Sequence, residues 1–236
     1  MKEAKRVYLT KEEFNMIASS KLGEGYDAIV YRGINGTVYK IYKYDNNEDI
    51  IDKATEKQET VKLTNLPQAA IYIDNKFSGY VLKRVRGLDL HHAWFLLSKK
   101  NKIKVLKELL IKVRELTDNY IYPTDIANSP LVGKHSNVKV DYKIHPQIID
   151  LDGISTSYSD KEDKCLLSDT YCGLSLLFLE LILGPDLFED IDNLNIPYIQ
   201  KLLIEANIED DIAKRLSNLE GTYEDINKLL LTFSKK

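Results

Sequence analysis

Cysteine is scarce in this chain, which argues against a structural zinc site. Among 236 residues only Cys165 and Cys172 are cysteines, and both lie beside an apolar segment. The sequence has no second pair of ligands at the spacing that a structural zinc site needs. We therefore expect two buried free thiols in a protein that works in a reducing compartment.

An excess of charge of one sign is also missing. Lysine and arginine number 33 and the acids 36, so the formal net charge is only −3. This balance predicts no global attraction to nucleic acid or to an anionic membrane, although it is compatible with a local basic stripe. We expect a protein substrate or protein binding partner and no nucleic acid; the oligomeric state is not readable.

Long hydrophobic runs are absent as well. The longest, LSLLFLELILG, is interrupted by Glu180 and is far too short to span a bilayer. The first residues, MKEAKRVYLTKEEF, are too charged for a secretory signal. These features predict no membrane span and a cytoplasmic location, in the protein's own cell or in the cytosol of a host.

Glycines are few, but two of them lie close together in LGEGYDAIVYRG, residues 22–33. Gly23 and Gly25 have two readings, either a loop that covers phosphates or a tight turn that needs positive φ. From Met16 to Tyr44 the pattern alternates, and the Asn35-Gly36 pair favours a hairpin. Three antiparallel strands are therefore expected here.

The remaining pattern predicts an α+β protein. Residues 48–66 follow a helical period that Pro67 ends, and residues 69–74 and 79–85 read as a hairpin around Asn75-Lys76. After Gly87 the helical period prevails, over residues 102–119, 168–184, 195–208 and 209–219. An antiparallel β-sheet with one helix is thus followed by a mainly helical part.

A lysine, Lys40, closes the strand TVYK shortly after the glycine loop. Such a lysine usually extends outward into solvent, but a phosphate cleft under a glycine loop needs a cation at this place. On the following helix Glu56 and Glu59 could each pair with it. We favour Glu59, nineteen residues on, because Leu63 and Leu66 follow it on one face. An exposed helix acid is the alternative.

At this point the chain resembles the protein kinase fold. LGEGYDAIVY is similar to that family's Gly-rich loop, with Ala28 in place of the third glycine, and TVYK is similar to its third-strand lysine motif. YVLKRVRGLDL resembles the strand that enters the interlobe hinge, with Leu82 as gatekeeper. The resemblance implies two lobes, residues 1–86 and 87–236. It also implies that ATP is bound by Gly23, Gly25, Val30, Val38, Lys40, Leu82, Lys83 and Val85.

The catalytic loop is the next match. LTDNYIYPTDIANSPLV resembles the end of the helix, the catalytic loop and the following strand of kinases. The resemblance makes Asp125 the aspartate that orients the acceptor hydroxyl and accepts its proton, with Lys40 and Glu59 as its catalytic companions. Pro123 replaces the usual histidine and Thr124 the usual arginine, which implies no activation by a phosphate docked on that arginine.

The metal motif follows in QIIDLDG. The resemblance makes Asp150 the Mg²⁺ ligand, and Asp152 could be a second one. The family's other ligand, an asparagine five residues after the catalytic aspartate, falls on Pro130. Asn128 could take its place if the loop is shortened, or it could simply cap a turn. Asn137 is a more remote candidate.

The helix of residues 168–184 resembles the buried helix of the kinase large lobe. The resemblance implies that Asp169 hydrogen-bonds the catalytic-loop backbone, although its spacing to Glu180 is one residue longer than usual. Two adjacent histidines, His91 and His92, are expected to satisfy backbone groups or cap a helix, because neighbouring helical residues do not face a common metal.

Three functions fit these matches. The first is an ATP- and Mg²⁺-dependent kinase that phosphorylates Ser or Thr hydroxyls of a protein, for which Lys40, Glu59, Asp125 and Asp150 are all present. The second is a catalytically weak or inactive pseudokinase that binds nucleotide or a partner protein, which Pro123, Pro130 and the short segment after the metal motif favour. The third is a small-molecule kinase similar to aminoglycoside or choline kinases, ranked last because the chain has little length for an acceptor-enclosing insertion.

Overall fold

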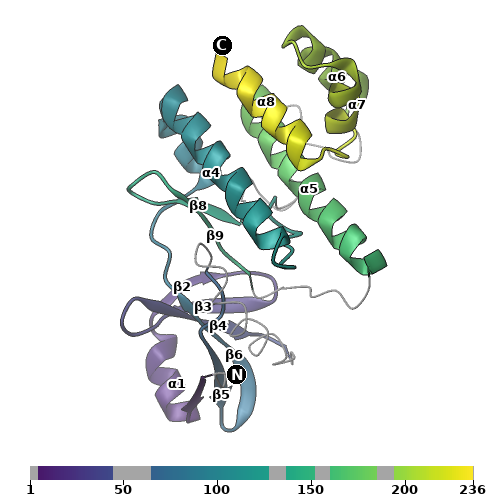
Figure 1. Cartoon of the computed structure of the whole chain (residues 1–236). Coiled ribbons are helices and arrows are strands. Elements are labelled where there is room, and N and C mark those ends of the chain that lie inside the picture. Colours follow the sequence, from purple (N-terminus) through teal and green to yellow (C-terminus); the bar gives the residue numbers. More distant parts are fainter. Residues whose placement is uncertain (1–4, 45–64, 128–136, 152–159, 185–193, 236) are drawn as a thin grey trace. The chain divides into compact units, whose positions relative to one another are not determined.

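The computed structural model describes residues 5–44, 65–127, 137–151, 160–184 and 194–235 (Figure 1). The chain divides into two compact units. The first, called the sheet unit, comprises residues 1–85 and 150–154, and the second, called the helical unit, comprises residues 86–149 and 155–236. The predicted helix over residues 48–66 lies outside the described residues.

A six-stranded sheet, in the order β1-β5-β6-β4-β3-β2, forms the sheet unit. All neighbouring strands are antiparallel except β1 and β5, which are parallel. The prediction of three antiparallel strands around the glycine loop and of a later hairpin is therefore confirmed. The strands are β1 (Arg6–Leu9), β2 (Lys21–Glu24), β3 (Ala28–Arg32), β4 (Thr37–Tyr42), β5 (Ala69–Ile73) and β6 (Lys76–Lys83).

Two tight turns set the strand register. Asn35 and Gly36 both adopt left-handed backbone conformations, with φ of 52° and 76°, as a two-residue hairpin turn requires. In the β5–β6 hairpin the left-handed residues are Asp74 and Asn75, with φ of 49° and 64°. The second turn therefore lies one residue earlier than the predicted Asn75-Lys76, because Asp and Asn both tolerate this conformation.

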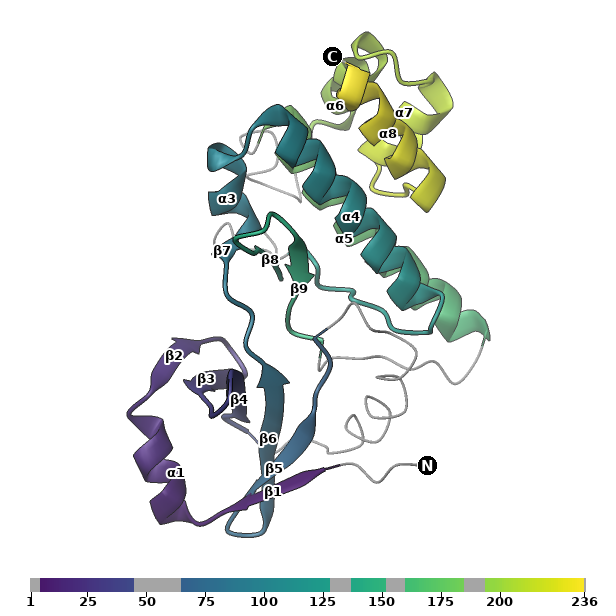
Figure 2. The same ribbon diagram turned by 60° about the vertical axis from the view of Figure 1, so that its left-hand side comes forward.

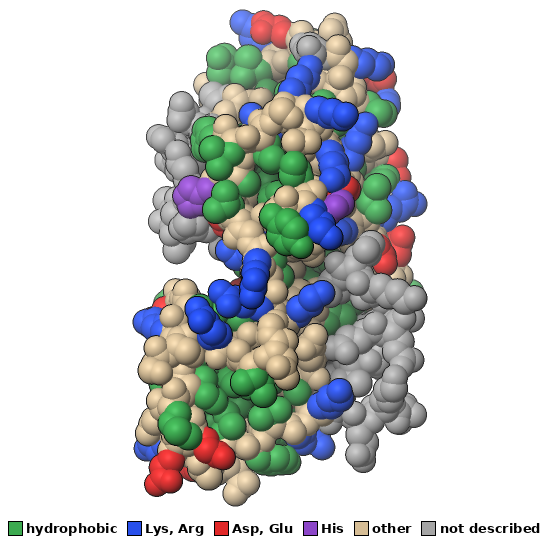
Figure 3. Space-filling model, turned by 90° about the vertical axis from the view of Figure 1, so that its left-hand side faces the viewer, with side chains coloured by type: hydrophobic (Ala, Val, Ile, Leu, Met, Phe, Trp, Pro, Cys, Tyr) green, Lys and Arg blue, Asp and Glu red, His purple; other side chains and the backbone are tan. Residues whose placement is uncertain are grey.

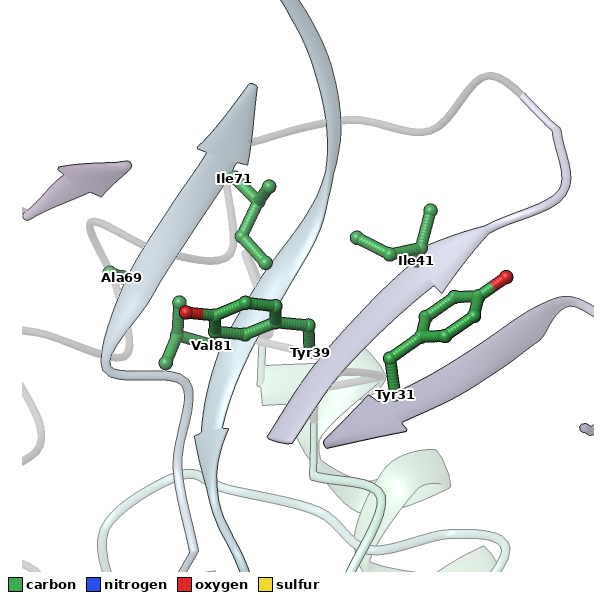
Figure 4. Close-up of a cluster of buried hydrophobic side chains, with 6 residues drawn as sticks. All are labelled: Tyr31, Tyr39, Ile41, Ala69, Ile71 and Val81. Carbon is green, nitrogen blue, oxygen red and sulfur yellow. The ribbon is translucent and has the colours of Figure 1, made fainter. Parts of the chain in front are cut away.

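A short helix, α1 (Lys11–Ala18), was not predicted and overlaps the region read as the approach to a strand. Thr10 starts it through a capping box, in which its side chain accepts from the Glu13 N–H while the Glu13 carboxylate accepts from the Thr10 N–H. Its apolar residues Phe14 and Ile17 pack on one face of the sheet (Figure 2). Figure 4 shows the buried side chains of that face, Tyr31, Tyr39, Ile41, Ala69, Ile71 and Val81.

The helical unit holds a small three-stranded sheet, β7-β8-β9, and six helices among the described residues. The four predicted helices correspond to α4, α5, α6 and α7, while α3 and α8 were not predicted. The elements are β7 (Leu88–Asp89), α3 (Leu90–Leu96), α4 (Lys99–Thr117), β8 (Val138–Val140), β9 (Pro146–Ile148), α5 (Asp160–Leu183), α6 (Ile196–Glu205), α7 (Asp210–Ser217) and α8 (Tyr223–Lys235).

Helix α5 supplies much of the core of this unit. Leu174, Leu177, Phe178 and Leu179 are fully buried, and α8 packs against both α5 and α4 (Figure 1). From Asp163 to Leu183 the helix is long and apolar enough to cross a bilayer by composition alone, but half of that stretch is buried inside the protein. A core helix explains its composition, and it does not indicate a membrane span.

The two cysteines correct one prediction. Cys165 is exposed rather than buried, and Cys172 is only half-buried; both are free thiols. Burial raises the pKa of the Cys172 thiol, and the nearby Asp169 adds to the effect. The error arose because both residues lie on α5, whose first turns are more exposed than its apolar second half.

Candidate functional site

One face of the six-stranded sheet gathers the predicted nucleotide-binding side chains. Val30 pairs with Lys40, Lys40 pairs with Tyr80, and Val38 pairs with Leu82. Cross-strand partners point to the same side of a sheet, so these five residues share a face. We call it the lysine face. It is opposite to the face that α1 covers, whose residues alternate with these along the strands.

Lys40 on this face forms an ion pair with Asp150, which is 110 residues away in the sequence. The Lys40 side chain is only 15% exposed, whereas that of Asp150 is 39% exposed. Asp150 has a left-handed backbone with φ of 64°. Such a conformation is uncommon for a residue with a Cβ and tends to occur at functional sites. The predicted lysine and metal-binding aspartate thus meet.

The glycine loop between β2 and β3 is closed by the Gly25 N–H, which donates to the Ala28 carbonyl at 2.8 Å. Neither Gly23 nor Gly25 has a left-handed backbone. A Cβ at Gly23 would meet no atom within 4 Å, and one at Gly25 would lie 3.8 Å from the Ala28 oxygen. By contrast, a Cβ at Gly33 would lie 2.3 Å from the Thr37 hydroxyl. The fold itself therefore requires Gly33 but neither glycine of the loop.

The base of this loop is fixed by charge. The Lys43 ammonium donates to the Gly25 carbonyl at 2.9 Å and pairs with a Glu24 oxygen at 2.6 Å. Hydrogen bonds from Lys21 and Lys43 lower the pKa of Glu24 to about 2. Tyr26, at the tip, is 88% exposed. The loop thus has a bound base and a tip that is open to solvent.

The end of β6 carries the predicted base-binding backbone. The Lys83 carbonyl accepts a hydrogen bond at 2.8 Å from the Asn65 side-chain amide, and Val85 is half-buried. Asn65 is buried, and its Oδ1 has no hydrogen-bond partner among the described residues. A carbonyl has two lone pairs, so Lys83 can still accept from an adenine amine. Asn65 was not predicted from the sequence, although a polar residue just before Leu66-Pro67 could have indicated it.

Asp125 lies in the helical unit with its side chain exposed. The Asn137 side-chain amide donates to both the Asp125 carbonyl and the Asp125 Oδ2, each at 3.0 Å. Asn137 is itself 9% exposed, and its backbone bonds the Ile126 carbonyl and the Ile149 N–H. The structure thus brings the remote candidate Asn137 onto the predicted catalytic aspartate. Asn128 lies outside the described residues, as do Glu59, Glu56, Pro130 and Asp152.

Helix α5 corrects the role expected for Asp169. That residue is exposed, whereas its neighbour Thr170 is fully buried and its hydroxyl has no partner among the described residues. The side of α5 that meets the catalytic loop carries Gly173, where a Cβ would lie 3.4 Å from the Thr124 carbonyl. Thr170 precedes Gly173 by three residues and so shares its side of the helix. The buried position is one residue later than predicted, which agrees with the unusual spacing to Glu180.

A second contact links the catalytic loop to α5. The hydroxyl of Tyr122, a buried residue three positions before Asp125, donates to Asp163 Oδ1 at 2.8 Å. Burial raises the pKa of Tyr122, and the bond to Asp163 raises it further. The segment before Asp125 is thereby held against α5.

His91 forms a buried charged cluster at the start of α3. Its Nε2 lies 3.1 Å from Glu180 Oε2 and its Nδ1 lies 3.5 Å from Asp89 Oδ1. Burial alone would lower the pKa of His91, but the carboxylates of Asp89 and Glu180 beside the ring outweigh it and raise the pKa to about 9. The Asp89 side chain also accepts from the His91 N–H and caps α3. The expectation of a capping role thus fails for His91, whose ring instead lies between two acids.

No group of three or more His, Cys, Asp or Glu side chains that could hold a metal occurs among the described residues. A magnesium ion that bridges phosphates needs only one or two protein oxygens, because the phosphates and water supply the others. Asp150, whose side chain is 39% exposed, offers a carboxylate of the kind that Mg²⁺ takes. The residues present are therefore compatible with the metal.

Comparison with known proteins shows the fold. No protein-family model matches the sequence, and no curated protein matches it significantly. Among solved structures 964 chains match, so the fold assignment does not depend on a single neighbour. One, described as an apo pseudokinase, has a TM-score of 0.57 at 10% identity, over 97% of this chain and 96% of its own. The chain therefore has a protein kinase-like fold, as the resemblance implied.

Proposed function

We propose that the protein is a phosphotransferase that uses ATP and Mg²⁺ and transfers the γ-phosphoryl group to Ser or Thr hydroxyls of a protein. The observation that carries the proposal is the ion pair between Lys40 and Asp150 on the lysine face. A half-buried lysine beside an aspartate with a left-handed backbone provides a cation for phosphate oxygens and a carboxylate for a metal. The glycine loop, whose glycines the fold does not need, leaves bare backbone near phosphates.

The roles of the residues follow from their chemistry. Lys40 would bind phosphate oxygens, and the N–H groups of the glycine loop would cover them. Asp150 would bind the metal, which when bound neutralises charge on the phosphates. Asp125 would accept the proton of the attacking Ser or Thr hydroxyl. The oxygen of that hydroxyl then forms a bond to the γ-phosphorus, while the bond between the γ-phosphorus and the leaving ADP breaks. Asn137 holds the Asp125 carboxylate in one orientation through its 3.0 Å hydrogen bond.

A pseudokinase is the second candidate. Departures from the kinase pattern support it: Pro123 and Thr124 stand where kinases carry histidine and arginine, and Thr170 occupies the buried position at which an aspartate was expected. The neighbour of known structure is itself described as a pseudokinase. In this alternative the lysine face binds nucleotide, or a partner, without turnover.

One experiment separates the two candidates. Thermal unfolding and transfer of radiolabelled phosphate to a mixture of protein substrates are measured with and without Mg²⁺, for the wild type and Asp150→Asn. Asp118→Asn is the matched control, since Asp118 is an exposed acid at the end of α4 whose nearest cation is Arg114 at 3.7 Å. The kinase is supported if ATP with Mg²⁺ stabilises the wild type and labelled phosphate is transferred, and if both effects are lost in Asp150→Asn but not in Asp118→Asn. ATP binding without transfer supports the pseudokinase.

A further inference from the structure

The first two turns of α4 carry a charge pattern that neither the fold nor the proposed chemistry explains. Residues 99–107 contain five lysines and no acid. The first turn of the helix likewise has no acidic residue. Cations at a helix N-terminus oppose the positive end of the helix dipole and lower helix stability. The five residues are Lys99, Lys100, Lys102, Lys104 and Lys107.

Few of these charges are neutralised within the protein. Among the described residues the only ion pair that involves the five lysines joins Lys104 to Glu108, at 3.8 Å. Glu108 is shared with His145, whose Nδ1 lies closer, at 2.7 Å. The Lys102 ammonium lies 4.9 Å from the centre of the Trp94 ring, which ties the start of α4 to α3. The surface therefore keeps a local excess of positive charge although the whole chain is slightly acidic.

A sixth lysine comes from a different element. Lys143 is exposed in the turn between β8 and β9, and its carbonyl accepts a hydrogen bond at 3.3 Å from the Lys104 ammonium. This contact places the hairpin turn against α4. The six lysines together form what we call the basic face. Figure 3 shows Lys and Arg side chains in a column over the helical unit, next to exposed hydrophobic ones.

Three large apolar side chains project beside the basic face. Phe95 and Leu96, at the end of α3, are 77% and 76% exposed, and Tyr142, next to Lys143, is 83% exposed. The next most exposed large apolar residues described in this unit are only 55% exposed. These side chains do not line a groove, because nearly all of their surface faces solvent.

We propose that the basic face, together with Phe95, Leu96 and Tyr142, docks onto an anionic membrane surface. Lysine clusters attract anionic lipid headgroups, and stable binding requires a second signal such as inserted apolar side chains. Both signals occur here on adjacent elements. A membrane suits this surface better than a protein partner, because protein interfaces are enriched in arginine and depleted in lysine, and all six cations are lysines. The proposal does not depend on kinase activity.

The test uses the full-length protein and vesicles of phosphatidylcholine, alone or with phosphatidylserine at about 30 mol%. Co-sedimentation should occur with the anionic vesicles only and should weaken strongly at about 0.5 M salt, where charges are screened. Trp94, the single tryptophan of the chain, adjoins Phe95 and reports insertion. Its fluorescence should be quenched by phosphatidylcholine brominated on the acyl chain when this lipid is mixed with phosphatidylserine.

Matched variants assign the binding to this surface. The triple change Lys99→Glu, Lys100→Glu, Lys143→Glu should reduce vesicle affinity by about 100-fold or more. The control Lys201→Glu with Lys214→Glu alters two exposed lysines of α6 and α7 and should leave affinity almost unchanged. Phe95→Ser with Leu96→Ser should abolish the quenching. Thermal unfolding of each variant shows whether it is folded.

Three results would overturn the proposal. The first is absence of binding to the anionic vesicles by folded wild-type protein. The second is an equal loss of affinity in the control pair and the triple variant. The third is tight binding to polyglutamate or to a DNA oligonucleotide, sensitive to the triple variant, without vesicle binding; this would assign the basic face to a protein or nucleic-acid partner instead.

Discussion

The two units position the residues of the proposed chemistry in different ways. In the sheet unit, Lys40 is aligned with Val30 and Tyr80 by strand register, so backbone pairing positions its side chain. In the helical unit, the Asn137 side-chain amide, from twelve residues further along the chain, donates a hydrogen bond to Asp125. Register is distributed over many backbone bonds, whereas the clasp of Asn137 on Asp125 is made by side-chain hydrogen bonds. The helical half should therefore be the more sensitive to one substitution.

The largest effect is expected for Asp125→Asn in this half. The exchange keeps the shape of the side chain and removes its basicity, so the rate of phosphate transfer should fall by about 100-fold or more. ATP affinity should stay nearly the same, because the residue acts on the acceptor hydroxyl. Lys40→Met is the counterpart in the sheet unit and should weaken both ATP binding and turnover. Steady-state kinetics and calorimetric ATP titration measure the two quantities, and a collapse of ATP affinity in Asp125→Asn would make that residue structural.

The clasp itself is the next target. Asn137→Ala removes the donor to Asp125 and should lower the rate by about 10- to 100-fold, since orienting partners of site residues typically contribute this much. Asn128→Ala is the matched comparison, because both asparagines were candidates for the displaced metal ligand. A loss that depends on Mg²⁺ concentration would assign the residue to the metal, and one that does not would assign it to Asp125. Equal activity of Asn137→Ala and wild type would contradict the clasp.

A loss of stability above neutral pH is expected from His91 in the helical unit. Since the pKa of His91 is raised to about 9, its charged form stabilises the fold fully below the unfolded value near 6.5. That contribution should be lost as the pH rises through about 9, with a ceiling of roughly 3 kcal/mol. The unfolding temperatures of wild type and His91→Gln should therefore converge as the pH rises from about 7 to about 10. Parallel curves would show that His91 is not charged in the folded protein.

The smallest effect distinguishes two kinds of glycine in the sheet unit. Gly23→Ala and Gly25→Ala should leave stability unchanged or raise it by up to about 1 kcal/mol, because a Cβ fits and the unfolded chain loses freedom. Both changes should weaken ATP binding. Gly33→Ala is the control and should destabilise the protein by about 1–3 kcal/mol through the clash with Thr37. Chemical denaturation and ATP titration measure these effects. If Gly25→Ala lowers the stability of the protein, the fold itself requires this glycine and the prediction is wrong.

The same contrast explains how much the sequence could predict. Strands alternate with a period of two, so Val30, Val38 and Lys40 could be placed on one face from the sequence, and the structure places them there. The partner of Asp125 could not be identified in this way, because the segment between it and Asn137 is longer than the motif predicts. No local sequence pattern specifies which distant asparagine will form a hydrogen bond to Asp125.

Helix register accounts for another error. A shift of one residue along a helix turns a side chain by about 100°, which is enough to move it from the core to the surface. Asp169 and Thr170 differ by that one step, and hydrophobic periodicity does not distinguish them where small polar residues face the core. Asp169 was predicted because the kinase pattern has an aspartate here. The spacing to Glu180, one residue longer than usual, already indicated the next position, Thr170.

Helix α5 connects two regions that the sequence keeps apart. Gly173 lies against the catalytic loop, and Glu180, seven residues on and so on the same side, pairs with His91 at the start of α3. Two turns of one helix, about 10 Å, therefore hold both contacts. The backbone amides of residues 121–127 and of α3 should accordingly exchange with deuterium as one cooperative unit. We therefore expect residues 121–127 to lose their protection from exchange whenever α5 separates from them.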